Sequence, residues 1–103
     1  MLTQIVHAAV LLLSCWYPLA AATPSGAVRV LTIDGAIGAA TADFVRSALT
    51  EAEQRDAPLV VMRLDTPGGL DAAMRDIVKE ILATRVPVAG YVAPSGARAA
   101  SAG

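Results

Sequence analysis

Apolar runs separated by turn signals predict three strands in the part of the chain that follows residue 27. Residues 28–33 alternate apolar with mixed side chains and stop at an Asp-Gly pair, which is typical of a strand and its turn. Residues 59–64 are almost continuously apolar, as in strands that are buried on both faces of a parallel sheet. A third run, residues 87–92, is followed by a Pro-Ser-Gly turn signal.

Two segments between these runs have the periodicity of amphipathic helices. Apolar positions recur at helical spacing between residues 39 and 55, with Thr41 as a candidate N-cap. One face of the second segment is a complete apolar stripe, formed by Leu70, Ala73, Met74, Ile77, Val78, Ile81 and Leu82. The small side chains of residues 97–103 predict the approach to a third helix. The order βαβαβ predicts an α/β fold with a parallel sheet and right-handed crossovers, and Phe44, Met62 and Met74 fit its core.

Residues 1–22 differ from the rest of the chain in composition. They contain no Asp, Glu, Lys or Arg, and an apolar run is followed by Pro18 and an A-x-A cleavage motif. We therefore expect a signal peptide in residues 1–22 and an exported mature chain in residues 23–103. An uncleaved N-terminal anchor is the main alternative, although Pro18 interrupts a run that is barely long enough to span a membrane. Lipid attachment at Cys15 is a third interpretation.

Composition and charge exclude several classes of function. A length of 103 residues allows one domain at most. Eight basic and nine acidic residues are spread without a run of either sign, which argues against nucleic-acid binding. The only Cys, Trp and His lie within residues 1–22, so the mature chain has no thiol nucleophile, His-based metal site or Ser-His pair. We expect neither a metal nor a cofactor.

Two segments hold more Gly and small residues than packing requires, namely residues 65–69 and 95–103. Each follows a predicted strand, at the edge where open α/β sheets bind their ligands. The Gly68-Gly69 pair before a helix leaves backbone N–H groups free to bind an anion or oxyanion, although by itself it is weak evidence, since a simple tight turn before a helix also explains it. Ser101 has small neighbours and an accessible hydroxyl, but a serine on a closely packed helix is the alternative, and the G-x-S-x-G motif is absent.

Taken together and in order, the segments I-D-G-A-I-G (33–38), L-D-T-P-G-G (64–69) and Y-V-A-P-S-G-A-R-A-A-S-A-G (91–103) closely resemble the NfeD-type membrane serine proteases. This family belongs to the ClpP/crotonase superfamily, and the resemblance extends from about residue 28 to residue 103. It implies a ClpP/crotonase-like fold in which Ser101 is the nucleophile. It also implies that the backbone N–H groups of Gly69 and Ala102 form the oxyanion hole.

The family pattern includes a lysine general base that lies beyond the serine in sequence. Gly103 is the last residue, and Lys79, the only lysine, lies on the polar face of the second predicted helix. The sequence therefore resembles a truncated, incomplete protease domain. Because an unactivated serine hydroxyl is a poor nucleophile, we expect the 103-residue fragment to be inactive.

For the complete protein, the resemblance implies a serine endopeptidase that cleaves hydrophobic peptide segments of a membrane protein. A stomatin-like partner, a homo-oligomer, a periplasmic or extracytoplasmic location, and membrane attachment outside this fragment are further implications. Two alternatives remain open. One is a non-catalytic ClpP-like scaffold that binds a membrane partner. The other is a related superfamily enzyme, such as a signal-peptide peptidase or an acyl-CoA hydratase-like protein.

Overall fold

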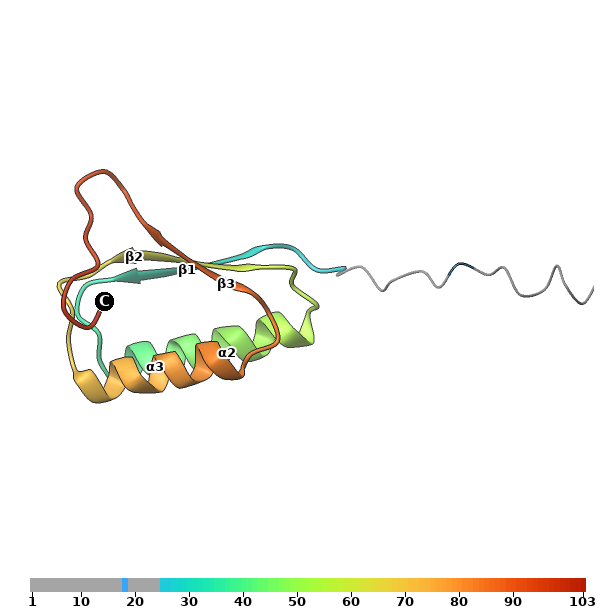
Figure 1. Ribbon diagram of the computed structural model, residues 1–103, viewed down its shortest axis with the longest axis horizontal. Coiled ribbons are helices and arrows are strands. Elements are labelled where there is room, and N and C mark those ends of the chain that lie inside the picture. Colours follow the sequence, from blue (N-terminus) through green and yellow to red (C-terminus); the bar gives the residue numbers. More distant parts are fainter. Residues whose placement is uncertain (1–17, 19–24) are drawn as a thin grey trace, which may run out of the picture.

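A computed structural model describes Pro18 and residues 25–103 (Figure 1). Its elements follow the order predicted from the sequence: β1 (Arg29–Asp34), α2 (Ala39–Gln54), β2 (Val60–Asp65), α3 (Asp71–Ala83) and β3 (Val88–Val92). Each boundary lies within two residues of its expected position. The signal peptide that we expect in residues 1–22 lies outside the described residues, apart from Pro18.

The three strands form one parallel sheet in the order β1-β2-β3, which places β2 in the centre. Leu31 pairs with Met62, which pairs in turn with Gly90, so these three residues form one row across the sheet. Because all strands run in the same direction, the turns after β1, β2 and β3 gather at one edge of the sheet. The α/β fold with a parallel sheet is therefore confirmed.

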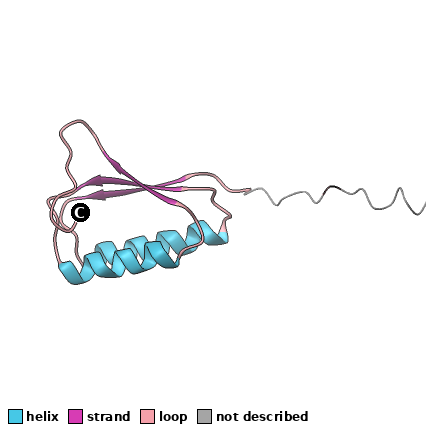
Figure 2. Ribbon diagram, in the orientation of Figure 1, coloured by secondary structure: helices cyan, strands magenta, loops and turns pink. Residues whose placement is uncertain are grey.

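Both helices pack on the same face of the sheet, side by side (Figure 2). Val45 of α2 and Val60 of β2 are fully buried, and the core extends between them. The other members of this core are Leu31, Ile33, Ile37, Ala42, Leu49, Ala52, Ala57, Met62, Ala73, Ile77 and Val86. The apolar faces that the sequence predicts for the two helices and for the strands thus pack against one another between the helix layer and the sheet.

The opposite face of the sheet has no covering layer among the described residues. Val30 of β1 and Tyr91 of β3 are 62% and 59% exposed, and Arg63 of β2 is also exposed. The expectation that residues 59–64 are buried on both faces is therefore wrong for this part of the chain. Phe44 is 48% exposed, so its expected place in the core is also wrong. It lies with Val28 and Val30 along the unpaired edge of β1.

The N-terminus of α2 differs from another expectation, that Thr41 is the N-cap. The N-cap is Gly38, and Thr41 lies three residues further on, inside the first turn. The hydroxyl of Thr41 accepts a hydrogen bond from the Gly38 backbone N–H at 3.2 Å. Thr41 therefore stabilises the start of the helix from the N3 position, as the reciprocal half of a capping box does.

Residues 97–103, predicted as the approach to a third helix, are not themselves helical, and the third helix stays a prediction. They pass along the end of β2, where Ala99 forms an isolated parallel bridge with Thr66, and residues 101 and 102 form a turn. A pattern of small residues suits a helix that packs closely, but it suits close passage of an extended segment equally well. The hydrogen bonds between the backbone of this segment and the backbone of Thr66 favour the close passage of a non-helical segment.

Ion pairs between exposed side chains link the two helices and the first strand. Arg46 of α2 pairs with Glu80 of α3 at 2.9 Å, and the hydrogen bond and charge of Glu80 raise the pKa of Arg46. Arg29 of β1 pairs with Glu51 of α2 at 2.7 Å. Because these side chains are at least partly exposed, each pair contributes little net stability.

Glu53 of α2 holds the connection between α3 and β3. Its Oε1 atom accepts hydrogen bonds from the Arg85 backbone N–H at 2.8 Å and from the Thr84 hydroxyl at 2.9 Å. These two bonds favour the ionised carboxylate and lower the pKa of Glu53 below its ordinary value of 4.5. The carboxylate thus stabilises this connection above that pH, and the contribution is lost as the pH falls through the lowered pKa.

We expect this loss to appear in the hydrogen exchange of the Arg85 amide. The protection factor, corrected for intrinsic exchange, should fall as the pH is lowered from 6 to 3. In Glu53→Gln, which keeps an oxygen acceptor but cannot ionise, the protection factor should not depend on pH over the same range. Equal pH dependence in the two proteins would contradict the role given to the Glu53 carboxylate.

Candidate active site

The Gly-rich turn after β2 (residues 66–69) and the segment that contains Ser101 (residues 95–103) lie together at the carboxyl edge of the sheet. The Thr66 backbone N–H donates to the Arg98 carbonyl at 2.7 Å, and the Ala100 N–H donates to the Thr66 carbonyl at 3.2 Å. A Cβ atom placed on Gly68 would lie 2.6 Å from the Cβ of Ser101. The two segments singled out from the sequence are therefore in direct contact.

The Gly-rich turn is shaped by its contact with Ile37, which follows β1. The Ile37 N–H donates to the Gly68 carbonyl, and the Leu70 N–H donates to the Ile37 carbonyl, both at 2.9 Å. Gly68 has a φ of +104°, a conformation that favours glycine. A Cβ atom on Gly69 would overlap the backbone oxygen and nitrogen of Ile37. Both glycines are therefore required by the local backbone.

Two backbone donors beside Ser101 are free of partners within the described residues. Neither the Gly69 N–H nor the Ala102 N–H donates a hydrogen bond there. Gly69 is exposed and Ala102 is half-buried, so a ligand can reach both residues. A Cβ atom on Gly68 would lie 3.0 Å from the Ala102 nitrogen, which places this donor against the Gly-rich turn.

Ser101 lies in a turn with a φ of +54°, in the left-handed region that non-glycine residues rarely occupy. The turn is closed by a hydrogen bond from the Gly103 N–H to the Ala100 carbonyl at 2.9 Å. The Ser101 side chain is exposed, and its hydroxyl has no partner among the described residues. This geometry presents the hydroxyl on a sharp turn, as the nucleophilic serines of α/β hydrolases are presented at strand ends.

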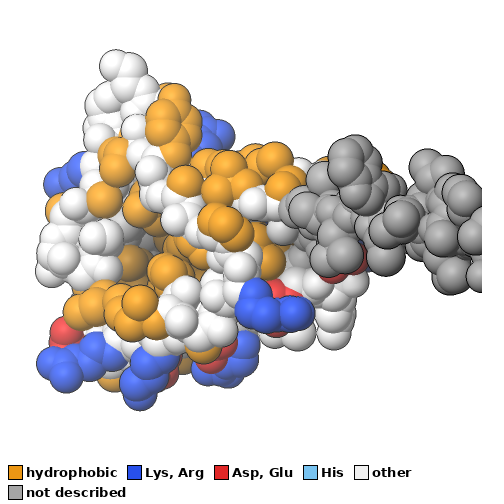
Figure 3. Space-filling view, turned by 45° about the vertical axis from the view of Figure 1, so that its right-hand side comes forward, with side chains coloured by type: hydrophobic (Ala, Val, Ile, Leu, Met, Phe, Trp, Pro, Cys, Tyr) orange, Lys and Arg blue, Asp and Glu red, His pale blue; other side chains and the backbone are white. Residues whose placement is uncertain are grey.

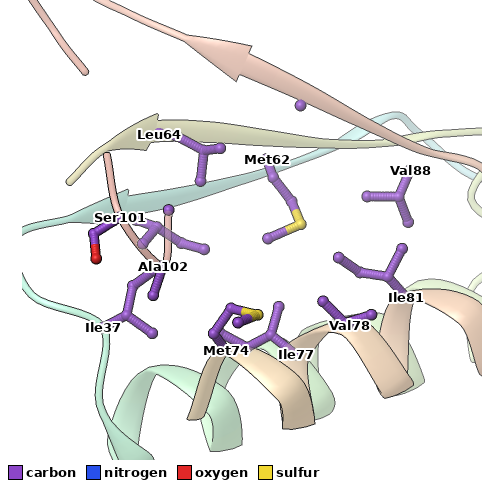
Figure 4. Close-up of a pocket in the computed structure, with 13 residues that line it drawn as sticks. Ile37, Met62, Leu64, Met74, Ile77, Val78, Ile81, Val88, Ser101 and Ala102 are labelled. Atoms are coloured by element: carbon purple, nitrogen blue, oxygen red, sulfur yellow. The ribbon is translucent and has the colours of Figure 1, made fainter. Parts of the chain in front are cut away.

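An apolar cleft of about 340 Å³ begins at Ser101 and extends between the sheet and α3 (Figure 4). Met62 and Leu64 of β2 line one side, whereas Met74 and Ile77 of α3 line the other. Ser101 and Ala102 lie at one end of it. The space-filling view shows hydrophobic side chains gathered in this hollow, with charged side chains along the outer surface of the helices (Figure 3).

The described residues provide no general base beside Ser101. Lys79 is 77% exposed and lies 3.8 Å from Asp76, as expected for the polar face of α3. The carboxylate of Asp65 accepts a hydrogen bond from the Arg98 backbone N–H at 3.3 Å, and the Arg98 side chain is exposed. No group of His, Cys, Asp and Glu side chains in residues 25–103 is arranged to hold a metal ion.

Two residues of this arrangement were not singled out from the sequence for a role in it. Ile37 contacts the Gly-rich turn through its backbone alone, and a backbone contact leaves no signature in residue type. Thr66 is fully buried, with its hydroxyl directed to Gly68. Its position two residues before Gly68 was the available signal, since a buried threonine next to flexible backbone must place its hydroxyl on a backbone group.

Comparison with known proteins identifies relatives for most of the chain, although no family model matches it. The chain is 46% identical over 76 residues to the membrane-bound protease PH1510 of Pyrococcus horikoshii. Two solved structures of a stomatin-specific membrane-bound protease are also similar. One is a serine-to-alanine mutant, with 44% identity over 76% of this chain and a TM-score of 0.73. The other is a lysine-to-alanine mutant in complex with a substrate peptide, with 43% identity over 79% of this chain and a TM-score of 0.74.

The chain spans only part of each relative. It covers 17% of the curated protease, and 38% and 37% of the two solved chains. Among its own described residues, none of the helices has the length and apolar character needed to cross a membrane.

Proposed function

We propose that this chain, a homologue of the NfeD-type membrane-bound proteases, supplies the nucleophile and the oxyanion hole of a serine endopeptidase. The observation that carries the proposal is the contact between the Gly-rich turn and the turn of Ser101. That contact brings an accessible serine hydroxyl together with two backbone N–H groups that have no other partner in the described part of the chain. A hydroxyl nucleophile and donors for the developing oxyanion are what acyl transfer requires.

In the proposed reaction, the Ser101 oxygen attacks the carbonyl carbon of a peptide bond. The negative charge that develops on the carbonyl oxygen is stabilised by the N–H groups of Gly69 and Ala102. The tetrahedral intermediate collapses, the C–N bond breaks, and the amine leaves with the proton that Ser101 gave up. Water then hydrolyses the acyl-enzyme by the same route, which releases the acid product and restores the hydroxyl.

A general base must accept the Ser101 proton, and we place it outside residues 1–103. The family resemblance makes this base a lysine, in a Ser-Lys dyad. Two observations support the assignment: Lys79 is exposed on α3 and paired with Asp76, and one solved relative is a lysine-to-alanine mutant bound to a substrate peptide. Residues 1–103 alone should consequently be inactive.

The substrate that we propose is an apolar segment of a membrane protein. The cleft beside Ser101 is lined by aliphatic and methionine side chains, which favour apolar substrate groups over charged ones. The solved relatives are described as specific for stomatin, and a stomatin-like substrate follows by homology. We also propose an exported homo-oligomer, with a signal peptide or anchor in residues 1–22.

The proposal is tested with two peptides of equal length, one apolar throughout and one in which Ser and Gln replace most apolar residues. The protein as encoded, including any polypeptide that continues beyond Gly103, should cleave the apolar peptide and leave the polar peptide intact. Mass spectrometry of the products provides the measurement. Cleavage of neither peptide would favour a non-catalytic scaffold, and equal cleavage of both would contradict the apolar specificity.

A further inference from the structure

We infer that Thr66 is a positioning residue for the reaction, because it fixes the oxyanion donor of Gly69 relative to Ser101. The inference rests on the proposed function. Thr66 directly follows β2, is fully buried, and contacts both segments of the candidate site. No other described side chain forms a hydrogen bond to the Gly-rich turn.

The hydroxyl of Thr66 acts on the Gly-rich turn. It accepts a hydrogen bond from the Gly68 N–H at 3.0 Å and lies 3.4 Å from the Gly68 carbonyl oxygen, to which it can donate weakly. The same carbonyl accepts the Ile37 N–H at 2.9 Å. Thr66 and Ile37 therefore hold both ends of the Gly68 residue in place.

The orientation of Gly68 determines the direction of the Gly69 donor. The carbonyl of Gly68 and the N–H of Gly69 belong to one peptide group, which is planar, and in a trans peptide the two bonds point in opposite directions. Holding the Gly68 oxygen toward Ile37 and Thr66 thus directs the Gly69 N–H away from them. Because Gly68 has no side chain, it can adopt several backbone conformations, and these hydrogen bonds favour the one with a φ of +104°.

The backbone and the methyl group of Thr66 act on the other segment. Its N–H donates to the carbonyl of Arg98, and its carbonyl accepts from the N–H of Ala100, the residue directly before Ser101. A Cβ atom on Gly103 would lie 2.6 Å from the Thr66 Cγ2 atom, so the methyl group packs against the end of the Ser101 turn. One buried residue thereby connects the donor side and the nucleophile side of the site.

The hydroxyl can be tested separately from the rest of the side chain. Thr66→Val keeps the shape but removes the hydroxyl, whereas Thr66→Ser keeps the hydroxyl and removes the methyl group. Thr84→Val is the matched control. It also loses a threonine hydroxyl bond, the one to Glu53, but at the far end of α3 from the Gly-rich turn.

The measurement is saturable labelling by a fluorophosphonate, carried out on the protein as encoded. It separates the maximal labelling rate from the concentration that gives half of it. Because small misplacements of reacting groups cost up to about 100-fold, we expect Thr66→Val to lower the maximal rate by about 10-fold to 100-fold. The half-saturating concentration should change by less than about twofold, since only transition-state stabilisation is lost. Thr84→Val should label at the wild-type rate, and Thr66→Ser, which keeps the hydroxyl and loses only the packing of the methyl group, should retain most of that rate.

Two outcomes would overturn the inference: wild-type labelling of Thr66→Val, or an equal loss of rate in Thr66→Ser and Thr66→Val. Should Thr66→Val fail to fold, Thr66→Ser decides the question alone, because a 10-fold loss with the hydroxyl present contradicts the assigned role. Failure of the proposed function is a different result, since wild-type protein would then remain unlabelled at Ser101.

Discussion

Gly69→Ala is expected to reduce peptide hydrolysis by about 100-fold to 1,000-fold, the usual cost of losing one oxyanion donor. The added Cβ atom would overlap the backbone of Ile37, so the turn must move away from it. That movement breaks the hydrogen bonds between Ile37 and the Gly-rich turn and rotates the peptide group that carries the Gly69 N–H. The maximal rate of fluorophosphonate labelling should fall in parallel with hydrolysis.

Gly38→Ala provides the control for this substitution. A Cβ atom on Gly38 meets no atom within 4 Å, and the residue has an extended backbone that any residue adopts. Its labelling rate should equal that of the wild type. Labelling of Gly69→Ala at the wild-type rate, in a protein that melts cooperatively, would show that the Gly69 N–H does not bind the oxyanion.

The regular elements could be predicted from the sequence because their side-chain periodicity reflects a single packed face. The stripe from Ala73 to Ile81 and the apolar run of β2 specify their elements with little help from the rest of the chain. The same periodicity does not show which faces of these elements are covered by other parts of the protein. Phe44 has the spacing of a core residue, but α2 turns it toward the unpaired edge of β1, where it is 48% exposed.

Only the part of the site whose chemistry depends on residue type could be predicted from the sequence. Gly68, Gly69 and Ser101 stand out by composition, and the structure places Gly68 against Ser101. The partners that shape the site act through backbone atoms, as Ile37 does, or through a hydroxyl whose target depends on the tertiary arrangement, as in Thr66. The same limitation applies to residues 97–103, whose path along Thr66 is set by backbone hydrogen bonds.

Ser101→Ala is expected to abolish hydrolysis, with a loss of at least about 10,000-fold, since the side chain that forms the acyl-enzyme is removed. The backbone of the turn should persist, because its hydrogen bond from Gly103 to Ala100 involves no side chain. Ser95→Ala is the matched control. Ser95 is an exposed serine on the preceding loop, and its loss should leave hydrolysis unchanged.

The most direct test of the nucleophile is the location of the covalent adduct. After reaction with a fluorophosphonate, the protein as encoded is digested, and the modified residue is identified by tandem mass spectrometry. The account predicts a single phosphonyl adduct on Ser101, present in Ser95→Ala and absent from Ser101→Ala. An adduct on another residue, or equal labelling of wild type and Ser101→Ala, would contradict it.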